Sequence, residues 1–305
     1  MELIATAESV EQAKELLHAG VDVLYVGEDE FGLRLPTSFS KEEIKEIVDI
    51  AHAEGKKVCV AVNALLHNDR IEKVIPYLQY LQSIHVDSVT VGDPGAIHLM
   101  KQNGLTIPYI YDAQTMVTSA NQVNFWAKRG AIGAVLAREI PYKELNEIQR
   151  QTMVPVEVLV YGATCIHQSM RPLVQNYFNY VGDDKEVVNE RQLFLSEPKK
   201  EHTHYSIYED RNGTHIFASD DVSLLTQLSK LDAIGIHKWK LDGIFAKGDR
   251  FVQIARVFDE ARTALTNGNW TDAIMQRLHD QLLELHPVGR TLNEGFFLKK
   301  PEDVQ

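Results

Sequence analysis

The hydrophobic residues of this chain alternate between short β-rich runs and longer amphipathic stretches. The short runs have the length and composition of buried strands, whereas the longer stretches repeat their apolar positions with a helical period. The predicted strands are residues 3–6, 21–26, 57–62, 88–91, 107–111, 131–136, 155–161 and 238–245. The predicted helices are residues 10–19, 41–54, 68–84, 94–102, 120–129, 142–151 and 249–265.

Glycines mark the ends of several predicted helices. Gly20, Gly55, Gly104 and Gly130 each follow a helical pattern and precede a strand, where a left-handed C-cap belongs. Eight strand-then-helix units over about 270 residues favour a (β/α)8 TIM-like barrel, with an open doubly wound sheet as the alternative. The pattern therefore predicts an α/β protein built on one barrel.

The alternation breaks between residues 162 and 224. This segment contains an acid-rich stretch at residues 182–190 and a predicted hairpin of residues 205–208 and 215–218. Asn212-Gly213 supplies the turn signal of that hairpin. A hairpin and a polar stretch between two barrel strands indicate an insertion.

The predicted domain organisation is one barrel with two additions. The barrel covers residues 1–268 and includes the insertion, residues 163–223, which follows strand seven on the face where barrel active sites form. Residues 269–305 are expected to form a helix and a tail that pack on the barrel.

Composition and charge narrow the classes of function. The 305 residues include 43 acids and 31 Lys or Arg, and the net charge of −12 opposes unaided binding to nucleic acid phosphates. The apolar runs are too short to span a bilayer, and the first twenty residues carry acids where a signal peptide carries bases. We therefore expect a cytoplasmic protein with no membrane contact.

The two cysteines, Cys59 and Cys165, provide neither a disulfide framework nor a four-cysteine metal site.

Polar residues follow the predicted strands at their C-terminal ends, where the sites of such barrels form. They are Glu28, Asn63, Asp93, Asp112, Gln114, Arg138, Glu139, residues 161–167, Lys240 and Asp242. Arg138 directly follows an apolar run, so it could hold a carboxylate or phosphate at the barrel mouth, or form an ion pair that braces the rim. Asn63 and Asp93 could instead cap the next helices, and Asp93 before Pro94 favours capping.

One cysteine and several histidines are candidates for catalysis or metal binding. Cys165 could be a nucleophile with His167 as its base, but near neighbours in a loop rarely reach hydrogen-bond geometry, so a buried structural role is favoured. His202, His204 and His215 could converge on the hairpin as a metal site. Zinc spacing is missing and the neighbouring residues are charged, so the pattern favours a solvated loop and no metal.

Blocks of sequence along nearly the whole chain resemble one known family. The run VEVLVYGATC at residues 156–165 and NYF at residues 176–178 resemble the signature of the collagenase-like peptidases, family U32 of unassigned mechanism. Further blocks in family order are GVDVLYVG (20–27), FGLR (31–34), VAVN (60–63), GDPG (92–95), VLARE (135–139), YEDRNG (208–213) and GFF (295–297). The resemblance implies the same barrel as the periodicity.

The departures from the family pattern concern its cofactor. Family members typically hold a [4Fe–4S] cluster with four cysteines, of which the first matches Cys165, the second matches Pro172, and none occurs in residues 181–205. One thiolate cannot hold such a cluster. The block at strand eight retains Lys240 and Asp242 but lacks the family's arginine. The chain is therefore similar to short members that bind no cofactor and accompany a longer paralogue carrying the [4Fe–4S] cluster.

The resemblance implies one of two functions. The family label is proteolysis, but many relatives act in oxygen-independent or prephenate-linked hydroxylation, including that of the tRNA wobble uridine to 5-hydroxyuridine. We expect the cluster-free subunit of a tRNA-hydroxylating heteromer, which contacts tRNA through a cluster-bearing paralogue; a collagenase-like peptidase is the alternative. The expected substrate-binding residues at the barrel mouth are Arg34, Asn63, Arg138, Glu139, Tyr161, Cys165, His167, Lys240 and Asp242.

Overall fold

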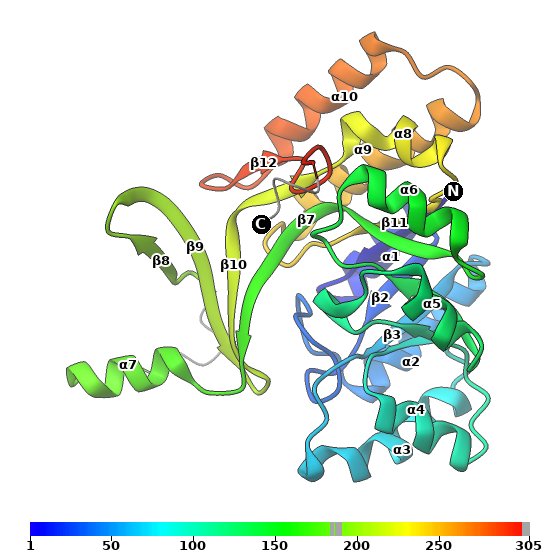
Figure 1. Cartoon of the computed structure of the whole chain (residues 1–305), viewed down its shortest axis with the longest axis vertical. Helices are drawn as coiled ribbons and strands as arrows, with labels where there is room; N and C mark the ends of the chain where they lie inside the picture. The colour runs from blue at the N-terminus through cyan, green and yellow to red at the C-terminus, as the bar shows by residue number, and fades with distance from the viewer. Residues whose placement is uncertain (184–185, 187–190, 301–305) are drawn as a thin grey trace.

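Eight parallel strands close into a barrel in the computed structural model, which describes residues 1–183, 186 and 191–300 (Figure 1). The strands are β1 (Glu2–Thr6), β2 (Val23–Val26), β3 (Lys57–Val62), β4 (Ser88–Val91), β5 (Tyr109–Tyr111), β6 (Ala131–Val135), β7 (Val156–Ser169) and β11 (Lys238–Leu241). The sheet closes because β11 pairs in parallel with both β1 and β7. The predicted (β/α)8 barrel is confirmed. Most of the acid-rich stretch at residues 182–190 lies outside the described residues.

Helices cover the outside of the barrel. They are α1 (Val10–His18), α2 (Lys41–Ala53), α3 (Asn68–Ser83), α4 (Pro94–Gln102), α5 (Ala120–Ala127), α6 (Tyr142–Gln151), α8 (Leu228–Ala233) and α9 (Gly248–Thr266). Gly20 and Gly130, which end helical segments, have φ of +95° and +104°, a left-handed conformation that glycine adopts without a steric penalty. Among the described residues, no helix is long and apolar enough to cross a membrane.

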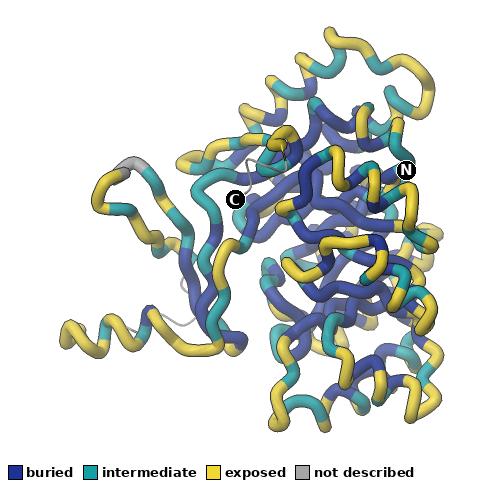
Figure 2. The backbone as a smooth tube through the Cα atoms, in the orientation of Figure 1, coloured by how far each residue is buried: buried dark blue, intermediate teal, exposed yellow. Residues whose placement is uncertain are grey.

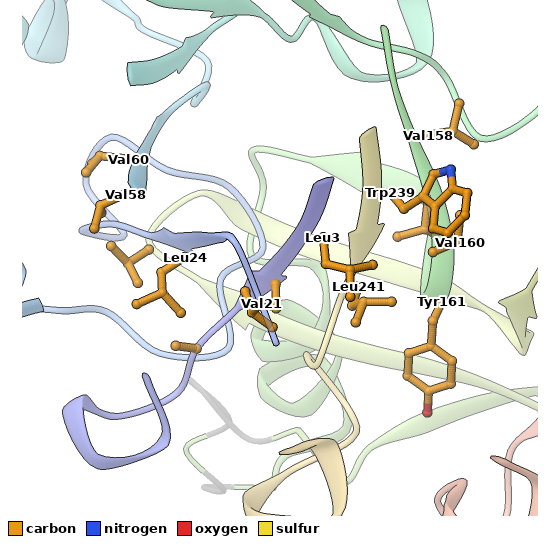
Figure 3. Close-up of a cluster of buried hydrophobic side chains, with 14 of the residues drawn as sticks. Leu3, Val21, Leu24, Val58, Val60, Val158, Val160, Tyr161, Trp239 and Leu241 are labelled. Carbon is orange, nitrogen blue, oxygen red and sulfur yellow. The ribbon is translucent and has the colours of Figure 1, made fainter. Parts of the chain in front are cut away.

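Side chains of the barrel strands alternate between the helix layer and the barrel interior. Trp239 and Leu241 of β11 are fully buried against the helices, whereas Lys240 between them points inward. Figure 3 shows apolar side chains of the outer layer, among them Leu3, Leu24, Val58, Val60, Trp239 and Leu241. The smaller inner layer combines Ile4, Val23, Tyr25, Cys59, Ala61 and Ile110. The alternation thus places every second residue of a strand in the interior that opens to the site.

Strand β7 does not end at residue 161 as predicted. It continues to Ser169, because its second half pairs antiparallel with β10 (Gly213–Ser223) and this pairing satisfies the backbone groups beyond the barrel. β10 pairs in turn with β9 (Lys200–Asp210), and β9 with β8 (Phe194–Glu197).

We call the described part of residues 162–223 the arm. It projects from the barrel and includes α7 (Leu173–Val181) (Figures 1 and 2).

The C-terminal segment packs on the barrel. Helix α10 (Asp272–Leu285) buries Leu278 and Leu282 completely and lies against α9. The tail then adds β12 (Thr291–Asn293) in parallel to β10, and its Phe297 packs against Tyr142 of α6 with ring centroids 5.2 Å apart. These contacts tie the tail to both the arm and the helix layer.

Candidate functional site

A cavity of about 340 Å³ opens at the C-terminal ends of the barrel strands. It is bounded on one side by the start of the arm, so β7 contributes to both the wall of the barrel and the wall of the cavity. Every residue expected at the mouth except Tyr161 lines it: Arg34, Asn63, Arg138, Glu139, Cys165, His167, Lys240 and Asp242. The structure therefore brings together candidates from five separate segments of the chain.

A buried ion pair forms the floor of the cavity. The Nζ of Lys240 lies 3.3 Å from Oε1 of Glu157, and both side chains are at most 8% exposed. The same Nζ lies 3.4 Å from the centroid of the Tyr25 ring. Burial lowers the pKa of Lys240, but the charge of Glu157, together with those of Asp112 and Asp242, outweighs this effect and raises the pKa above its usual range. The cavity therefore has a permanently charged ammonium at its base.

Asn63 connects two walls of the cavity. Its Oδ1 accepts a hydrogen bond from the Leu33 amide at 3.0 Å, and its Nδ2 donates to Oδ2 of Asp112 at 2.6 Å and to the Tyr25 hydroxyl at 3.2 Å. The helix-capping alternative is wrong for this residue, because helix α3 begins after His67. It is confirmed for Asp93, which caps α4 through the Gly95 and Ala96 amides.

Arg34 reaches across the cavity to two glutamines. Its guanidinium donates to Oε1 of Gln168 at 2.8 Å and to Oε1 of Gln114. Arg34 and Gln114 have φ of +53° and +57°, a left-handed conformation that costs a non-glycine residue of order 1 kcal/mol and that concentrates at functional sites. Within the described ranges, Arg34 forms no ion pair with a carboxylate, so its positive charge is not neutralised by a direct partner.

Arg138 is held at the rim by the arm and by β11. It donates to the Ala163 carbonyl and lies 3.2 Å from Oδ2 of Asp242, whose side chain is 7% exposed. Glu139, its neighbour in sequence, is exposed on the rim. The ion pair foreseen as the alternative role thus exists, and its partner is Asp242. The Arg138 side chain remains 26% exposed and lines the cavity, so both roles are compatible with its position.

Tyr161 lies outside the cavity, contrary to its expected place at the mouth. Strand alternation would point it inward, but the register of β7 against β11 shifts after Lys240 and Gly162 follows with φ +128°. Such an irregularity rotates the side chain to the other face of the strand. Its hydroxyl pairs with Nδ1 of His286 at 2.9 Å, and its ring lies among outer-layer side chains (Figure 3).

Cys165 lines the cavity, and its partner differs from the one considered in the sequence. The thiol donates to the backbone carbonyl of His167 at 3.2 Å, whereas the His167 side chain is exposed. The histidine ring that interacts with the thiol is that of His215, on the adjacent strand β10. The solvated-loop interpretation of the hairpin is therefore wrong for His215, which is fully buried.

The cysteines of this chain are too few for the family's iron–sulfur cluster. A [4Fe–4S] cluster needs four thiolates, and the chain contains two cysteines, of which Cys59 lies in β3 with 3% exposure. Burial raises the pKa of the Cys59 thiol to about 12, which opposes metal ligation. In the part of the chain that the structure describes, no group of three or more His, Cys, Asp and Glu is placed to hold a metal ion. The residues of this chain do not fit the cluster.

Several residues of the site are not among those that the sequence predicts at the barrel mouth. Tyr25 and Glu157 lie within predicted strands, and their inward direction follows from the alternation once the barrel is known. Gln168 and His215 reach the site through the antiparallel pairing of β7 with β10, which the sequence does not predict. The sequence offers His215 only as a candidate metal ligand.

The fold and the cavity define a class: a (β/α)8-barrel protein with a charged chamber at its strand ends. The model of peptidase family U32 matches residues 8–305, and the chain belongs to that family. The solved structure of the U32 peptidase Mk0906 superposes with a TM-score of 0.52 at 17% identity over 81% of this chain and 93% of that one, which supports the fold alone.

Relatives with curated names share most of the chain. The tRNA hydroxylation protein P2 of Bacillus subtilis is 33% identical over 98% of both chains. The tRNA hydroxylation protein P of Haemophilus influenzae is 26% identical over 99% of this chain and 75% of its own length. B. subtilis also has a tRNA hydroxylation protein P1, 27% identical over 79% of this chain and 58% of the relative. Paralogous proteins of this family therefore coexist in one organism.

Proposed function

We propose that this chain is the cluster-free subunit of a cytoplasmic system that hydroxylates the tRNA wobble uridine to 5-hydroxyuridine. The observation that carries the proposal is the full-length similarity to tRNA hydroxylation protein P2. The charged cavity supports it, because a chamber of about 340 Å³ suits a small molecule and not an extended peptide. Arg34, Asn63, Arg138, Lys240 and Asp242 are the residues we assign to binding that molecule.

The proposal is tested by the nucleosides of tRNA. A strain that lacks this chain is expected to contain no 5-hydroxyuridine in its tRNA by mass spectrometry, while other modified nucleosides stay at their normal levels. Peptidase activity, the alternative, is tested with gelatin peptides, from which the purified chain is expected to release no new amino termini.

The purified chain is expected to be colourless and to contain no stoichiometric iron. The reason is chemical, since Cys165 and the buried Cys59 cannot supply four thiolates. Iron analysis and a visible spectrum, recorded for the chain alone and after coexpression with a cluster-bearing paralogue, measure this directly. One iron–sulfur cluster per chain in the protein expressed alone would refute the cluster-free assignment.

The redox centre must then come from a partner, and the arm offers a surface for it. Helix α7 is anchored at its start, where the Val174 and Gln175 amides donate to the buried carboxylate of Glu209 at 2.5 and 3.1 Å. Most of the helix is exposed (Figure 2). Its exposed residues include Tyr177 and Tyr180, at 61% and 89% exposure. Firmly anchored helices with exposed aromatic residues are typical of protein interfaces. We assign α7 to contact with the cluster-bearing paralogue.

Tyr180→Asp is expected to weaken the heteromer about thirtyfold, because a buried aromatic anchor contributes about 2 kcal/mol or more to an interface. Coexpression with the paralogue followed by size-exclusion chromatography measures the loss of co-elution. Met153→Asp is the matched control: Met153 is also exposed, at 66%, but lies in the loop between α6 and β7, and its variant should co-elute normally. Co-elution unaffected by Tyr180→Asp would remove α7 from the interface.

A further inference from the structure

Three residues from neighbouring strands of the arm form a connected polar cluster beside the cavity. Cys165 of β7 is opposite Phe217 of β10, which places the thiol diagonally across from His215 on the same face. Nε2 of His215 lies 2.9 Å from Oδ1 of Asp210, the last residue of β9. The thiol therefore lies at the cavity wall, and the imidazole and the carboxylate follow it into the arm.

The buried histidine is oriented toward the cysteine. The His215 side chain is fully buried, and its ring lies against Tyr208 with centroids 5.0 Å apart. Asp210 engages Nε2, and Nδ1 has no hydrogen-bond partner among the described residues, so Nδ1 is the nitrogen available to take a proton from the thiol. Asp210 is fixed in turn by the Asn212 amide, which donates to the same Oδ1 at 2.7 Å. A carboxylate on one nitrogen of an imidazole prepares the other to accept a proton.

The charges around Cys165 favour its thiolate. Burial raises the pKa of this thiol, but the neighbouring imidazole of His215 and the positive charges of Arg34 and Arg138 together outweigh burial and bring the pKa below its usual value. For His215, burial lowers the pKa, but the hydrogen bond with Asp210 and the neighbouring Cys165 together outweigh burial and raise the pKa. The lowered pKa of Cys165 and the raised pKa of His215 both favour a thiolate and imidazolium pair. The pKa of Cys59, deep in β3, is instead raised by burial.

We propose that Cys165, His215 and Asp210 form an activated-thiol site that adds reversibly to the carbonyl carbon of a small anionic compound in the barrel cavity. His215 takes the thiol proton, and Sγ forms a bond with the carbonyl carbon. The π electron pair of the carbonyl moves to its oxygen, which takes the proton from the imidazolium. A thiohemiacetal results, so atoms and charge balance and no oxidant or reductant is needed.

The cavity defines the class of the compound. Arg34 and Arg138 line it near the thiol, and Arg34 is bonded only to the amide oxygens of Gln114 and Gln168 among the described residues. A guanidinium held in this way can exchange a neutral acceptor for a carboxylate or phosphate, which binds it more strongly. The volume of about 340 Å³ limits the ligand to a small molecule.

The unmodified protein provides the first test, with iodoacetamide and iodoacetate as probes. In each case Sγ attacks the CH2 carbon and iodide leaves with the bonding pair. At pH 7, Cys165 is expected to react about tenfold faster than the thiol of glutathione, because its lowered pKa increases the fraction present as thiolate. Cys59 is the internal control and should remain unmodified by intact-protein and peptide mass spectrometry. The ratio of iodoacetate to iodoacetamide rates should be about tenfold higher on Cys165 than on glutathione, because the two arginines attract the anion.

A carbonyl compound provides the second test. Glyoxylate, a small anionic aldehyde, should protect Cys165 from iodoacetamide at concentrations at least tenfold lower than acetaldehyde, its neutral control. His215→Gln and Asp210→Asn should each slow alkylation of Cys165 severalfold or more, whereas Cys59→Ala should leave the rate unchanged. If His215→Gln fails to fold, the rates of the unmodified protein and of Asp210→Asn still decide the matter.

Two results would overturn the proposal. One is alkylation of Cys165 no faster than that of glutathione, and the other is equal protection by glyoxylate and acetaldehyde. Hydrolysis of gelatin peptides that is lost in Cys165→Ala would also overturn it, since the substrate class would then be a peptide. None of these measurements depends on tRNA hydroxylation, so a failure of this proposal can be distinguished from a failure of the proposed function.

Discussion

Glu157→Gln is expected to destabilise the folded chain by about 3–5 kcal/mol, because it removes the ion-pair partner of the buried Lys240 ammonium. The side chains of this pair are 4% and 8% exposed, so water cannot replace the lost partner. The Tyr25 ring beneath the ammonium remains, but its attraction is too weak to compensate. Urea denaturation followed by circular dichroism measures the change in the free energy of unfolding.

Urea denaturation of further variants distinguishes loss of the ion pair from loss of side-chain packing. Lys240→Met should also destabilise the chain, but the double variant should lose clearly less than the sum of the single variants, since it contains neither unpaired charge. Asp49→Asn is the control at the exposed Lys45–Asp49 pair of α2 and should change the free energy by less than about 1 kcal/mol. Additive losses at the floor of the cavity would contradict a coupled buried pair.

Arg138→Ala is expected to reduce 5-hydroxyuridine in tRNA to about a tenth of its normal level or less. The reason is the loss of a guanidinium that lines the cavity, where a charge-assisted hydrogen bond contributes about 1.5–3 kcal/mol. The variant is introduced in place of the chromosomal gene, and nucleosides are measured by mass spectrometry.

Arg150→Ala serves as the matched control for this experiment. Arg150 is a 72% exposed arginine of α6, and its removal should leave the tRNA unchanged. The purified Arg138→Ala chain must also keep its circular dichroism spectrum. Normal 5-hydroxyuridine in cells with a folded Arg138→Ala chain would reduce Arg138 to a brace between Asp242 and the Ala163 carbonyl.

The barrel could be predicted because its strands repeat one local pattern. Runs such as β3, with Val58 and Val60 facing helices and Cys59 facing the interior, are apolar on both sides. Each run is followed by a helix, and several of these helices end near a glycine. The local sequence therefore contains the pattern that predicts the barrel. The end of β7 could not be predicted, because its second half is a strand only through pairing with β10, about fifty residues later.

The same distinction explains which site residues were foreseen. Asn63 and Lys240 were identified from position alone, since the C-terminal ends of parallel strands converge in any such barrel. Strand alternation wrongly predicts that Tyr161 faces the cavity, because the register of β7 against β11 shifts before this residue. No local sequence pattern marks that shift. The sequence offers only the near neighbour His167 as a partner for Cys165 and favours a structural role, whereas the fold supplies His215 from another strand. Side-chain partners that depend on strand pairing require the structure.

The most direct test of the central claim measures 5-hydroxyuridine in tRNA from a strain that lacks this chain, with and without its gene restored on a plasmid. A third culture overproduces the cluster-bearing paralogue in place of the missing chain. The account predicts that 5-hydroxyuridine is absent in the deletion strain, returns with the plasmid-borne gene and stays absent with the paralogue alone. Normal 5-hydroxyuridine in the deletion strain, under growth conditions in which the parent strain contains it, would contradict the account.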